Sequence, residues 1–557
     1  MIDTAIVTTG TGVVAGLGYA PALWVKPAPV LPPSYDAPLS EEARESEIER
    51  WKAAVVTVAE RLTARASNAS GAAAEVLGAT AALAADRGLQ RATAKLISAG
   101  STAESATVAA IAQFIEKFEK LGGLMAERVT DLGDIRNRVV SELLGLPEPG
   151  VPTPERPIVL LAEDLAPADT ATLDPALIHG VATRLGGPTS HTAIIARQLG
   201  IPCIVAAADL ASIQEGALVL LDGGAGTLFV GTDPVEAEAR VLADAARREA
   251  VQSWTGPGRT QDGTAVELLA NVQDGAGARA AAKFPAQGVG LFRTELCFLS
   301  AQTEPSVADQ AGIYGEVLAA FPDQKVVFRT LDAGSDKPVP FVLHPEEENP
   351  ALGVRGIRLG QADPGLLERQ LDAIALAAKQ QGVTNAKVMA PMVATIDEAQ
   401  DFAAACRARQ LSPGIMVEVP SVALLAEAFL EEVDFMSVGT NDLTQYAMAA
   451  DRMAPSLAAL TDPWQPAVLH LIRSAAAAGV SSQKPVGVCG EAAADPFLAC
   501  ILVGLGLSSL SMAPNALAAV GLQLGSVSLD QCQRAAAAVL RCTTAREARS
   551  TAHELLS

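Results

Sequence analysis

The sequence is poor in cysteine, aromatic residues and positive charge. Its seven cysteines lie scattered among 557 residues with no CxxC spacing, so we expect reduced thiols rather than a disulfide framework or a zinc site. The formal net charge is −22. Because phosphate backbones bind to basic surfaces, this charge excludes a nucleic acid as the main partner. It suits a basic protein, or a small anion held in a local positive pocket.

Long apolar runs are also missing. No stretch of about 18 consecutive apolar residues occurs, which argues against a membrane span. The start, MIDTAIVTTGTG, lacks the basic and apolar segments of a signal peptide. We therefore expect a cytoplasmic protein without membrane insertion. Half of the residues are apolar, and the length predicts two to four domains with sizeable cores.

Two proline-rich joints, KPAPVLPPSYDAP and PEPGVPTPERP, enclose a block that is almost wholly helical. A short β-like start precedes the first joint, and runs such as PIVLLAEDL and ALVLLDGG follow the second. Because the amino-terminal strand has no partner in the helical block, we expect it to join an α/β domain made of residues 1–30 and 146–232. The helices of residues 36–145 are then an insertion, and a charged connecting helix lies within 233–256.

Residues 257–557 alternate strand-like and helical patterns. The predicted strands are VELLANV, GVGLFR, VVFRTLD, VRGIRL, KVMAPMV, GIMVEV, FMSVGT and PVGVCG. Eight such β/α units favour a (β/α)8 barrel over an open sheet. The predicted fold class is therefore multidomain α/β: an α/β domain with an inserted helical bundle, followed by a TIM-type barrel.

Polar residues gather at the ends of these predicted strands, where barrels place their active sites. Packing alone would put apolar residues there or scatter the charges. Arginine has a planar fork that matches phosphate or carboxylate oxygens in pairs, although an isolated charge near a strand end is more often a solvated loop residue. The residues at or near the strand ends are Arg293, Arg329, Lys337, Glu418, Asn441, Asp442, Arg452 and Cys489.

Three of these residues have a purely structural explanation as well as a chemical one. Glu418 and Asp442 are carboxylates at neighbouring strand ends, and one or two such ligands, completed by substrate oxygens and water, are typical of a Mg²⁺ site. Each could instead pair with an arginine. Cys489 could donate a proton to a carbon atom, or it could be a buried, inert thiol.

A histidine lies on the turn in GGPTSHTAIIARQLGIPCIV, directly before a helical pattern. The neutral imidazole of His191 is a good nucleophile near pH 7, and a helix amino terminus would favour a phosphoryl group once attached. The alternative is a histidine beside the helix cap with no chemical role.

The stretch around His191 resembles the phosphohistidine signature of phosphoenolpyruvate-using phosphotransferases. GVGLFRTELCFL, FRTLDAGSDKPVPF, ENPALGVRGIR, GIMVEVPS, SVGTNDLTQYAMAADR and VGVCGEAAAD resemble the barrel motifs of these enzymes in the same order. The match runs through nearly the whole chain. Together the motifs are similar to those of the Enzyme I family, the phosphoenolpyruvate–protein phosphotransferases of bacterial sugar uptake.

The resemblance implies that His191 takes a phosphoryl group from phosphoenolpyruvate and passes it to the carrier protein HPr, which binds to the helical domain. Pyruvate leaves after Cys489 protonates the enolate. Mg²⁺ is the implied cofactor, and a homodimer would form through the barrel. The implied substrate-site residues are Arg293, Arg329, Lys337, Asn441, Asp442, Arg452, Arg355 and Thr170, the last supporting His191, and the implied metal ligands are Glu418 and Asp442.

The chain departs from the family pattern at a few positions: Pro188 replaces an arginine, Ser335 a glycine, Met453 and Ala454 a Gly-Asn pair, and Gln465 a histidine. Two alternative functions remain. One is half of a nucleotide-coupled dikinase, and the other is a non-catalytic sensor of phosphoenolpyruvate. The sequence has no GxxxxGK[ST] loop and no spare length for a nucleotide-binding domain, so the phosphoryl acceptor is expected outside the chain.

Overall fold

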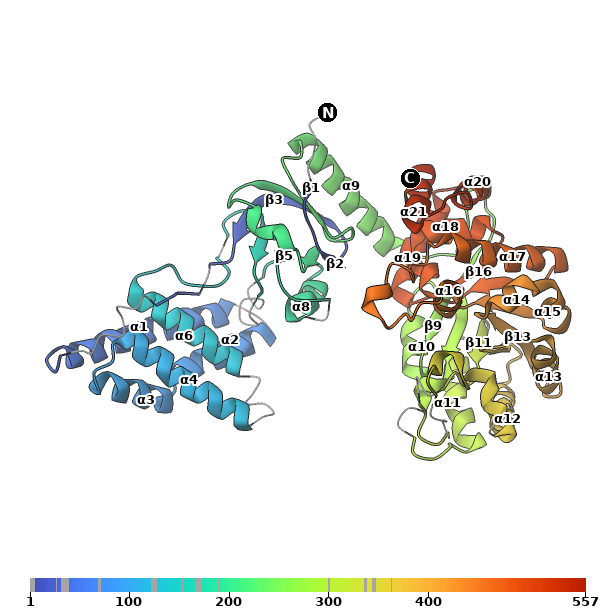
Figure 1. Ribbon diagram of the computed structural model, residues 1–557, viewed down its shortest axis with the longest axis horizontal. Helices are drawn as coiled ribbons and strands as arrows, with labels where there is room; N and C mark the ends of the chain where they lie inside the picture. Colours follow the sequence, from blue (N-terminus) through green and yellow to red (C-terminus); the bar gives the residue numbers. More distant parts are fainter. Residues whose placement is uncertain are drawn as a thin grey trace. The chain divides into compact units, whose positions relative to one another are not determined.

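The computed structural model divides into two compact units, Met1–Arg248 and Glu249–Ser557, shown in Figure 1. Each unit has hydrophobic cores of its own. The structure describes residues 6–26, 28–31, 40–68, 72–121, 128–152, 154–165, 173–188, 190–298, 301–334, 338–342, 347–361 and 363–557.

The first unit contains a sheet in the strand order β1-β8-β7-β3-β4-β5-β6-β2. Its central strand β4 has the sequence IVLLA and is buried at every position, as expected where both faces of a strand are covered. β3 pairs in parallel with β4 and antiparallel with β7, so segments far apart in the sequence share this sheet. The strands are β1 Ile6–Thr9, β2 Thr11–Val14, β3 Leu17–Trp24, β4 Ile158–Ala162, β5 Ile178–Thr183, β6 Cys203–Val205, β7 Leu218–Asp222 and β8 Thr227–Val230.

A helical bundle lies between β3 and β4 in the chain. Its core includes Trp51, whose indole Nε1 donates a hydrogen bond of 3.1 Å to the Thr107 hydroxyl. The expected α/β domain with an inserted helical bundle is thus confirmed. The bundle helices are α1 Ala43–Asn68, α2 Ala72–Ala84, α3 Arg87–Ser98, α4 Ala103–Leu121 and α6 Val129–Leu144. In the α/β part of the chain, α8 His191–Leu199 lies between β5 and β6, the 3₁₀ helix η2 Ala208–Ser212 lies between β6 and β7, and α9 Pro234–Ser253 follows β8.

The second unit is a closed barrel of eight parallel strands, in which β16 pairs with β9 to complete the ring. The expected TIM-type barrel is confirmed. Its strands are β9 Glu267–Val272, β10 Gly288–Arg293, β11 Lys325–Arg329, β12 Ala386–Ala390, β13 Ser412–Val417, β14 Phe435–Val438, β15 Val486–Val488 and β16 Ser509–Met512.

Helices surround the barrel and bury their apolar faces against its outer side (Figure 1). Several start at side-chain caps, such as the capping box of Thr395 and Glu398 at α13. The helices are α10 Gly275–Ala281, α11 Val307–Ala320, α12 Pro364–Gln381, α13 Ile396–Arg407, α14 Pro420–Leu424, α15 Ala426–Glu432, α16 Thr440–Met448, α17 Pro466–Ser482, α18 Pro496–Gly504, α19 Leu517–Gly525, α20 Leu529–Val539 and α21 Ala545–Leu556.

Short 3₁₀ helices lie in several loops of this unit. They are η3 Thr294–Cys297, η4 Pro350–Leu352, η5 Gly356–Gln361, η6 Pro455–Leu457, η7 Glu491–Ala494 and η8 Pro514–Ala516.

One predicted barrel strand is wrong. The last four residues of VRGIRL lie in η5 instead, because Gly356 takes a left-handed φ of +58° and the buried Arg355 side chain is held by carboxylates at the end of the barrel. The eighth strand is instead the unpredicted β16, SLSM. Its four residues alternate serine with a large apolar residue, a pattern too short and too polar to stand out in the sequence.

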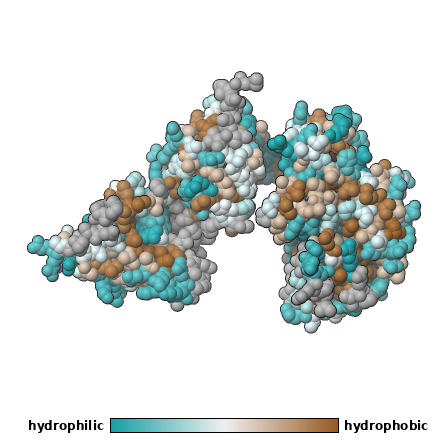
Figure 2. Space-filling model, in the orientation of Figure 1, coloured by the Kyte–Doolittle hydropathy of each residue, from teal (hydrophilic) through white to brown (hydrophobic). Residues whose placement is uncertain are grey.

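No helix in the described ranges is long and apolar enough to cross a bilayer. Figure 2 shows apolar and hydrophilic residues interspersed over each unit on the face viewed.

Candidate active site at the carboxyl end of the barrel

The parallel strands of the barrel end at one mouth, and six residues predicted from the sequence meet there around a cavity of about 660 Å³. Each residue is placed there by the strand or helix in which it lies or which it follows. Two are the last residues of β10 and β11, two lie in the first turn of α16 after β14, one follows α16, and one follows β15. They are Arg293, Arg329, Asn441, Asp442, Arg452 and Cys489.

Arg329 is the most strongly fixed cation of this cavity. It is 6% exposed, forms an ion pair with Glu295, and places Nη1 3.0 Å from Asp332 Oδ2. Burial alone would lower the pKa of Arg329, but the carboxylates of Glu295, Asp332 and Glu418 raise it above its usual range. The guanidinium is therefore permanently charged and held in one orientation.

Arg355 is held by carboxylates behind this cavity. It is 1% exposed, its Nη2 contacts both oxygens of Asp332 at 3.0 Å, and its Nη1 lies 3.4 Å from Asp442 Oδ1. Asp442 also faces Arg452, with 3.8 Å between Oδ2 and Nη1. Arg355 thus connects the carboxylate that fixes Arg329 with the carboxylate on α16.

Glu418 follows β13 and is fully buried. Its Oε1 accepts a hydrogen bond of 2.5 Å from the backbone N–H of Met392, a residue with a left-handed φ of +62°. Its Oε2 is buried without a hydrogen-bond partner. Burial, followed by the charges of Asp442 and Asp332, raises the pKa of Glu418 to about 8.

Glu418 and Asp442 are chemically suited to a hard divalent cation. The unpartnered Oε2 of Glu418 lies 2.9 Å from the point where a Cβ on Gly439 would be, and Gly439 lines the cavity. A side chain at position 439 would therefore collide with this oxygen. Groups of three or more His, Cys, Asp or Glu side chains placed to hold a metal do not occur among the described residues. Two carboxylates completed by substrate oxygens and water are a typical protein contribution to a divalent-metal site.

Cys489 is 2% exposed, and its Sγ donates to the Val438 carbonyl at 3.5 Å. Burial raises the pKa of Cys489 to about 11, against the opposing effects of the Ser437 hydroxyl and Arg329. The thiol is therefore protonated at neutral pH, the state that a proton donor requires.

His191 is the first residue of α8 in the other unit. Ser190 caps this helix by accepting a 3.3 Å hydrogen bond from the N–H of Ala193, and Gly186 provides the preceding turn with φ +89°. The position at a helix amino terminus was predicted from the sequence. Thr170, Lys337 and Ser335 lie outside the described residues.

Sequence reasoning did not single out Glu295, Asp332 or Gly439. Asp332 stood within the motif FRTLDAGSDK, three residues after Arg329, and that spacing was the available signal. Of the departures from the family pattern, Met453 lines the cavity and is 80% exposed. Gln465 donates from Nε2 to the Ala459 carbonyl at 2.9 Å.

Comparison with known proteins places these features in a family. Three family models match: the PEP-utilising enzyme N-terminal domain at residues 9–128, the mobile domain at 154–226 and the PEP-binding domain at 247–528. The chain is 47% identical to the phosphoenolpyruvate-protein phosphotransferase of Streptomyces coelicolor over 98% of this chain and 99% of that protein. The chain belongs to the phosphoenolpyruvate–protein phosphotransferase family. It is accordingly a transferase of the phosphoenolpyruvate-utilising class.

A second curated relative agrees with this assignment. The chain is 42% identical to the phosphoenolpyruvate-protein phosphotransferase of Haloferax volcanii, over 75% of each chain. An NMR solution structure of Enzyme I is 29% identical, with 43% of this chain and 99% of that chain covered and a TM-score of 0.39. Enzymes of this family need a divalent metal ion, and the pair Glu418 and Asp442 fits one.

The first prediction concerns Asp332, which is 1% exposed between two buried arginines. Asp332→Asn removes their shared negative charge and should lower the free energy of unfolding of the barrel by about 3 kcal/mol. In scanning calorimetry of the full chain, the barrel transition should move to lower temperature while that of the first unit stays in place.

The matched control is Asp530→Asn, which removes the carboxylate of the exposed pair with Arg534. Exposed pairs contribute little, so the barrel transition should hardly move. Equal shifts for the two variants would show that Asp332 does not fix the two arginines.

Proposed function

We propose that this chain transfers the phosphoryl group of phosphoenolpyruvate to its own His191 and then to a histidine of the carrier protein HPr, with release of pyruvate, as the first step of sugar uptake by the phosphotransferase system. The observation that carries this proposal is the cavity in which arginines, an amide and a carboxylate surround a protonated thiol. Such a set suits an anion that loses a phosphoryl group and gains a proton on carbon.

The cations of the cavity bind the substrate and stabilise the moving charge. Arg293, Arg329 and Arg452 would hold the phosphate and carboxylate oxygens through paired N–H donors. Because Arg329 is already fixed by Glu295 and Asp332, it needs no reorientation as charge develops on the phosphoryl oxygens. We assign the side chains of Asn441 and Lys337 to the same substrate. Arg355, behind the cavity, would keep Asp332 and Asp442 in place.

Glu418 and Asp442 would hold the divalent metal, which we propose to be Mg²⁺. When bound, the ion supplies positive charge that neutralises the substrate oxygens. The unpartnered Oε2 of Glu418 supports this assignment, because an unpaired carboxylate oxygen buried in a protein is costly unless a cation or donor meets it.

His191 would attack phosphorus in line, supported by Thr170, and the helix amino terminus of α8 would favour the negative charge that results. Since the histidine and the cavity belong to different units of the chain, we propose that the α/β domain, residues 1–30 and 146–232, swivels between the barrel and HPr. The connecting segment 233–256, which contains α9, would permit this movement.

The remaining assignments follow from the family resemblance. The helical domain of residues 36–145 would bind HPr, and the barrel of residues 257–557 would form the homodimer. We place the enzyme in the cytoplasm, with no nucleic acid among its partners.

The central experiment is to incubate the purified chain with labelled phosphoenolpyruvate and Mg²⁺. The unaltered chain should gain an acid-labile phosphate, and His191→Ala should gain none, because the nucleophile is removed. His179→Ala, a change at a β5 histidine of the same unit, serves as the control and should be labelled fully. Labelling by ATP alone would favour a dikinase half, and binding without labelling would favour a sensor.

A second prediction concerns metal binding. In Gly439→Ala the new Cβ would lie 2.8 Å from Met416 Cε and 2.9 Å from Glu418 Oε2, so the carboxylate must shift. We expect Mn²⁺, a paramagnetic substitute for Mg²⁺, to bind about 10–100-fold more weakly, as measured by electron paramagnetic resonance. Gly312→Ala, on α11 with open space around it, should leave Mn²⁺ binding unchanged. Unaltered binding in Gly439→Ala would remove Glu418 from the ligand set.

A third prediction concerns the proton donor. Cys489→Ala should slow the formation of keto pyruvate by about 100-fold or more, with little change in the affinity for phosphoenolpyruvate, because the neutral thiol contributes little to anion binding. The comparison is Cys406→Ala, which removes another buried thiol of the barrel unit, on α13. A large loss of affinity with normal pyruvate formation would contradict the donor role.

A further inference from the structure

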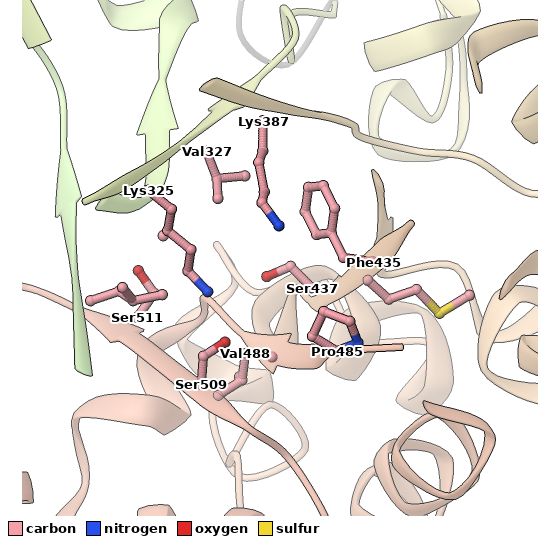
Figure 3. Close-up of a pocket in the computed structure, with 13 residues that line it drawn as sticks. Lys325, Val327, Lys387, Phe435, Ser437, Pro485, Val488, Ser509 and Ser511 are labelled. Atoms are coloured by element: carbon pink, nitrogen blue, oxygen red, sulfur yellow. The ribbon is translucent and has the colours of Figure 1, made fainter. Parts of the chain in front are cut away.

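A second, smaller cavity lies inside the barrel at the amino-terminal ends of the strands, opposite the active-site mouth (Figure 3). We call it the lysine–serine cavity after its polar lining, which consists of Lys325, Lys387, Ser437, Ser509 and Ser511. Its volume is about 30 Å³, whereas a water molecule needs roughly 10–15 Å³ by this measure. Barrel interiors are usually filled by bulky branched side chains, so free space with a polar lining is unusual here.

Small residues create this space. A Cβ on Gly290 would lie 2.4 Å from the Ser511 hydroxyl, and a Cβ on Gly487 would lie 2.2 Å from the Ser509 hydroxyl. The Ser511 hydroxyl is occupied, because it donates a hydrogen bond of 2.5 Å to Asn271 Oδ1. The Ser509 hydroxyl forms no hydrogen bond with any residue that the structure describes. It is therefore available as a donor to a ligand.

Two lysines bring positive charge to the lysine–serine cavity. Lys325 is the first residue of β11 and Lys387 is the second residue of β12, and both are only partly exposed. Figure 3 shows the amine ends of both lysines and the hydroxyls of Ser437 and Ser509 directed toward the same space. An ammonium group has donors only, and a hydroxyl can donate as well. The space is thus suited to an acceptor that carries negative charge.

Lys387 lacks a counter-charge among the described residues. Lys325 forms an ion pair with Glu267, and Asp434 Oδ1 lies 3.0 Å from Arg407 Nη2, whereas Lys387 forms neither an ion pair nor a hydrogen bond with the described parts of the chain. Burial, and after it the ammonium group of Lys325, lowers the pKa of Lys387, while Glu267 and Asp434 act in the opposite direction. Because a partly buried charge without a partner is costly, an anion beside Lys387 would be stabilising.

The Phe435 ring compensates for part of the missing charge. Its centroid lies 5.4 Å from Lys387 Nζ, a separation at which the face of an aromatic ring attracts a cation. The ring meets one side of the ammonium group only and is no counter-ion. A purely structural explanation would leave Lys387 to Phe435 and water, with no ion in the cavity. The two explanations differ in how the barrel responds to small anions.

We propose that the lysine–serine cavity binds one small inorganic anion of the halide class, such as chloride, between the ammonium groups of Lys387 and Lys325. The Ser509 hydroxyl donates a further hydrogen bond to the ion. A cavity of about 30 Å³ holds a single ion of this size and is too small for a nucleotide or a sugar phosphate. The ion supplies the negative charge that Lys387 lacks and links the starts of β11, β12 and β16. Its binding is independent of the proposed phosphoryl transfer, which takes place at the other end of the barrel.

The test is scanning calorimetry of the full chain without phosphoenolpyruvate, in which sodium chloride replaces sodium gluconate at constant ionic strength. Gluconate is too large for the cavity. A ligand that binds only the folded state stabilises it, so the barrel transition should rise by about 2 °C or more as chloride replaces gluconate. The transition of the first unit serves as an internal reference. An unchanged barrel transition would overturn the proposal.

A pair of lysine variants assigns the effect to the lysine–serine cavity. Lys387→Met keeps the length of the side chain but removes its charge, so chloride should raise the barrel transition of this variant less than that of the unaltered chain. Lys379→Met, which changes an exposed lysine of α12, is the matched control and should respond fully. Chloride at the arginines of the active-site mouth contributes equally to all three proteins and cancels in the comparison. Equal chloride shifts in Lys387→Met and the unaltered chain, or an equally reduced shift in Lys379→Met, would overturn the proposal.

A second measurement does not depend on the folding of any variant. Crystals of the unaltered chain soaked in sodium bromide should show an anomalous scattering peak in the lysine–serine cavity, within hydrogen-bond distance of Lys387 Nζ and the Ser509 hydroxyl. Bromide replaces chloride as a halide that anomalous scattering can locate. Bromide peaks elsewhere on the protein with none in this cavity would show that Lys387 is held by Phe435 and water alone.

Discussion

The arrangement of the active site depends on one buried carboxylate, that of Asp332, held between two buried arginines. Arginine and carboxylate side chains alternate on both sides of Asp332 at the carboxyl-terminal mouth of the barrel, and each forms an ion pair with the next. Buried charges are tolerated when they are paired, so the cavity can present the paired guanidinium groups of Arg329 and Arg452 to an anion. The connected residues, in order, are Glu295, Arg329, Asp332, Arg355, Asp442 and Arg452.

Glu418 differs from the carboxylates in this series. Asp332 has both oxygens engaged by guanidinium groups, whereas one oxygen of Glu418 accepts from a backbone N–H and the other has no hydrogen-bond partner. The backbone donor depends on the left-handed conformation of Met392, and access to the free oxygen depends on Gly439. Strained backbone at such a place is retained where the surrounding structure requires it, and here it directs the Met392 N–H to one oxygen of Glu418.

Sequence patterns predicted the groups whose position follows from the strands and missed those whose position follows from tertiary contact. Arg329 and Cys489 lie at strand ends, so the alternation of strands and helices was enough to bring them together. Asp332 bridges two arginines 26 residues apart in the chain, and no local pattern specifies that contact. The segment VRGIRL was predicted as a strand, but Arg355 and the left-handed Gly356 lead it into a 3₁₀ helix.

The strand SLSM was not predicted because its inward residues are serines rather than large apolar side chains. The interior therefore has two different layers. Leu291, Val327 and Met389 pack with Cys489 and desolvate it, which keeps the thiol protonated at neutral pH.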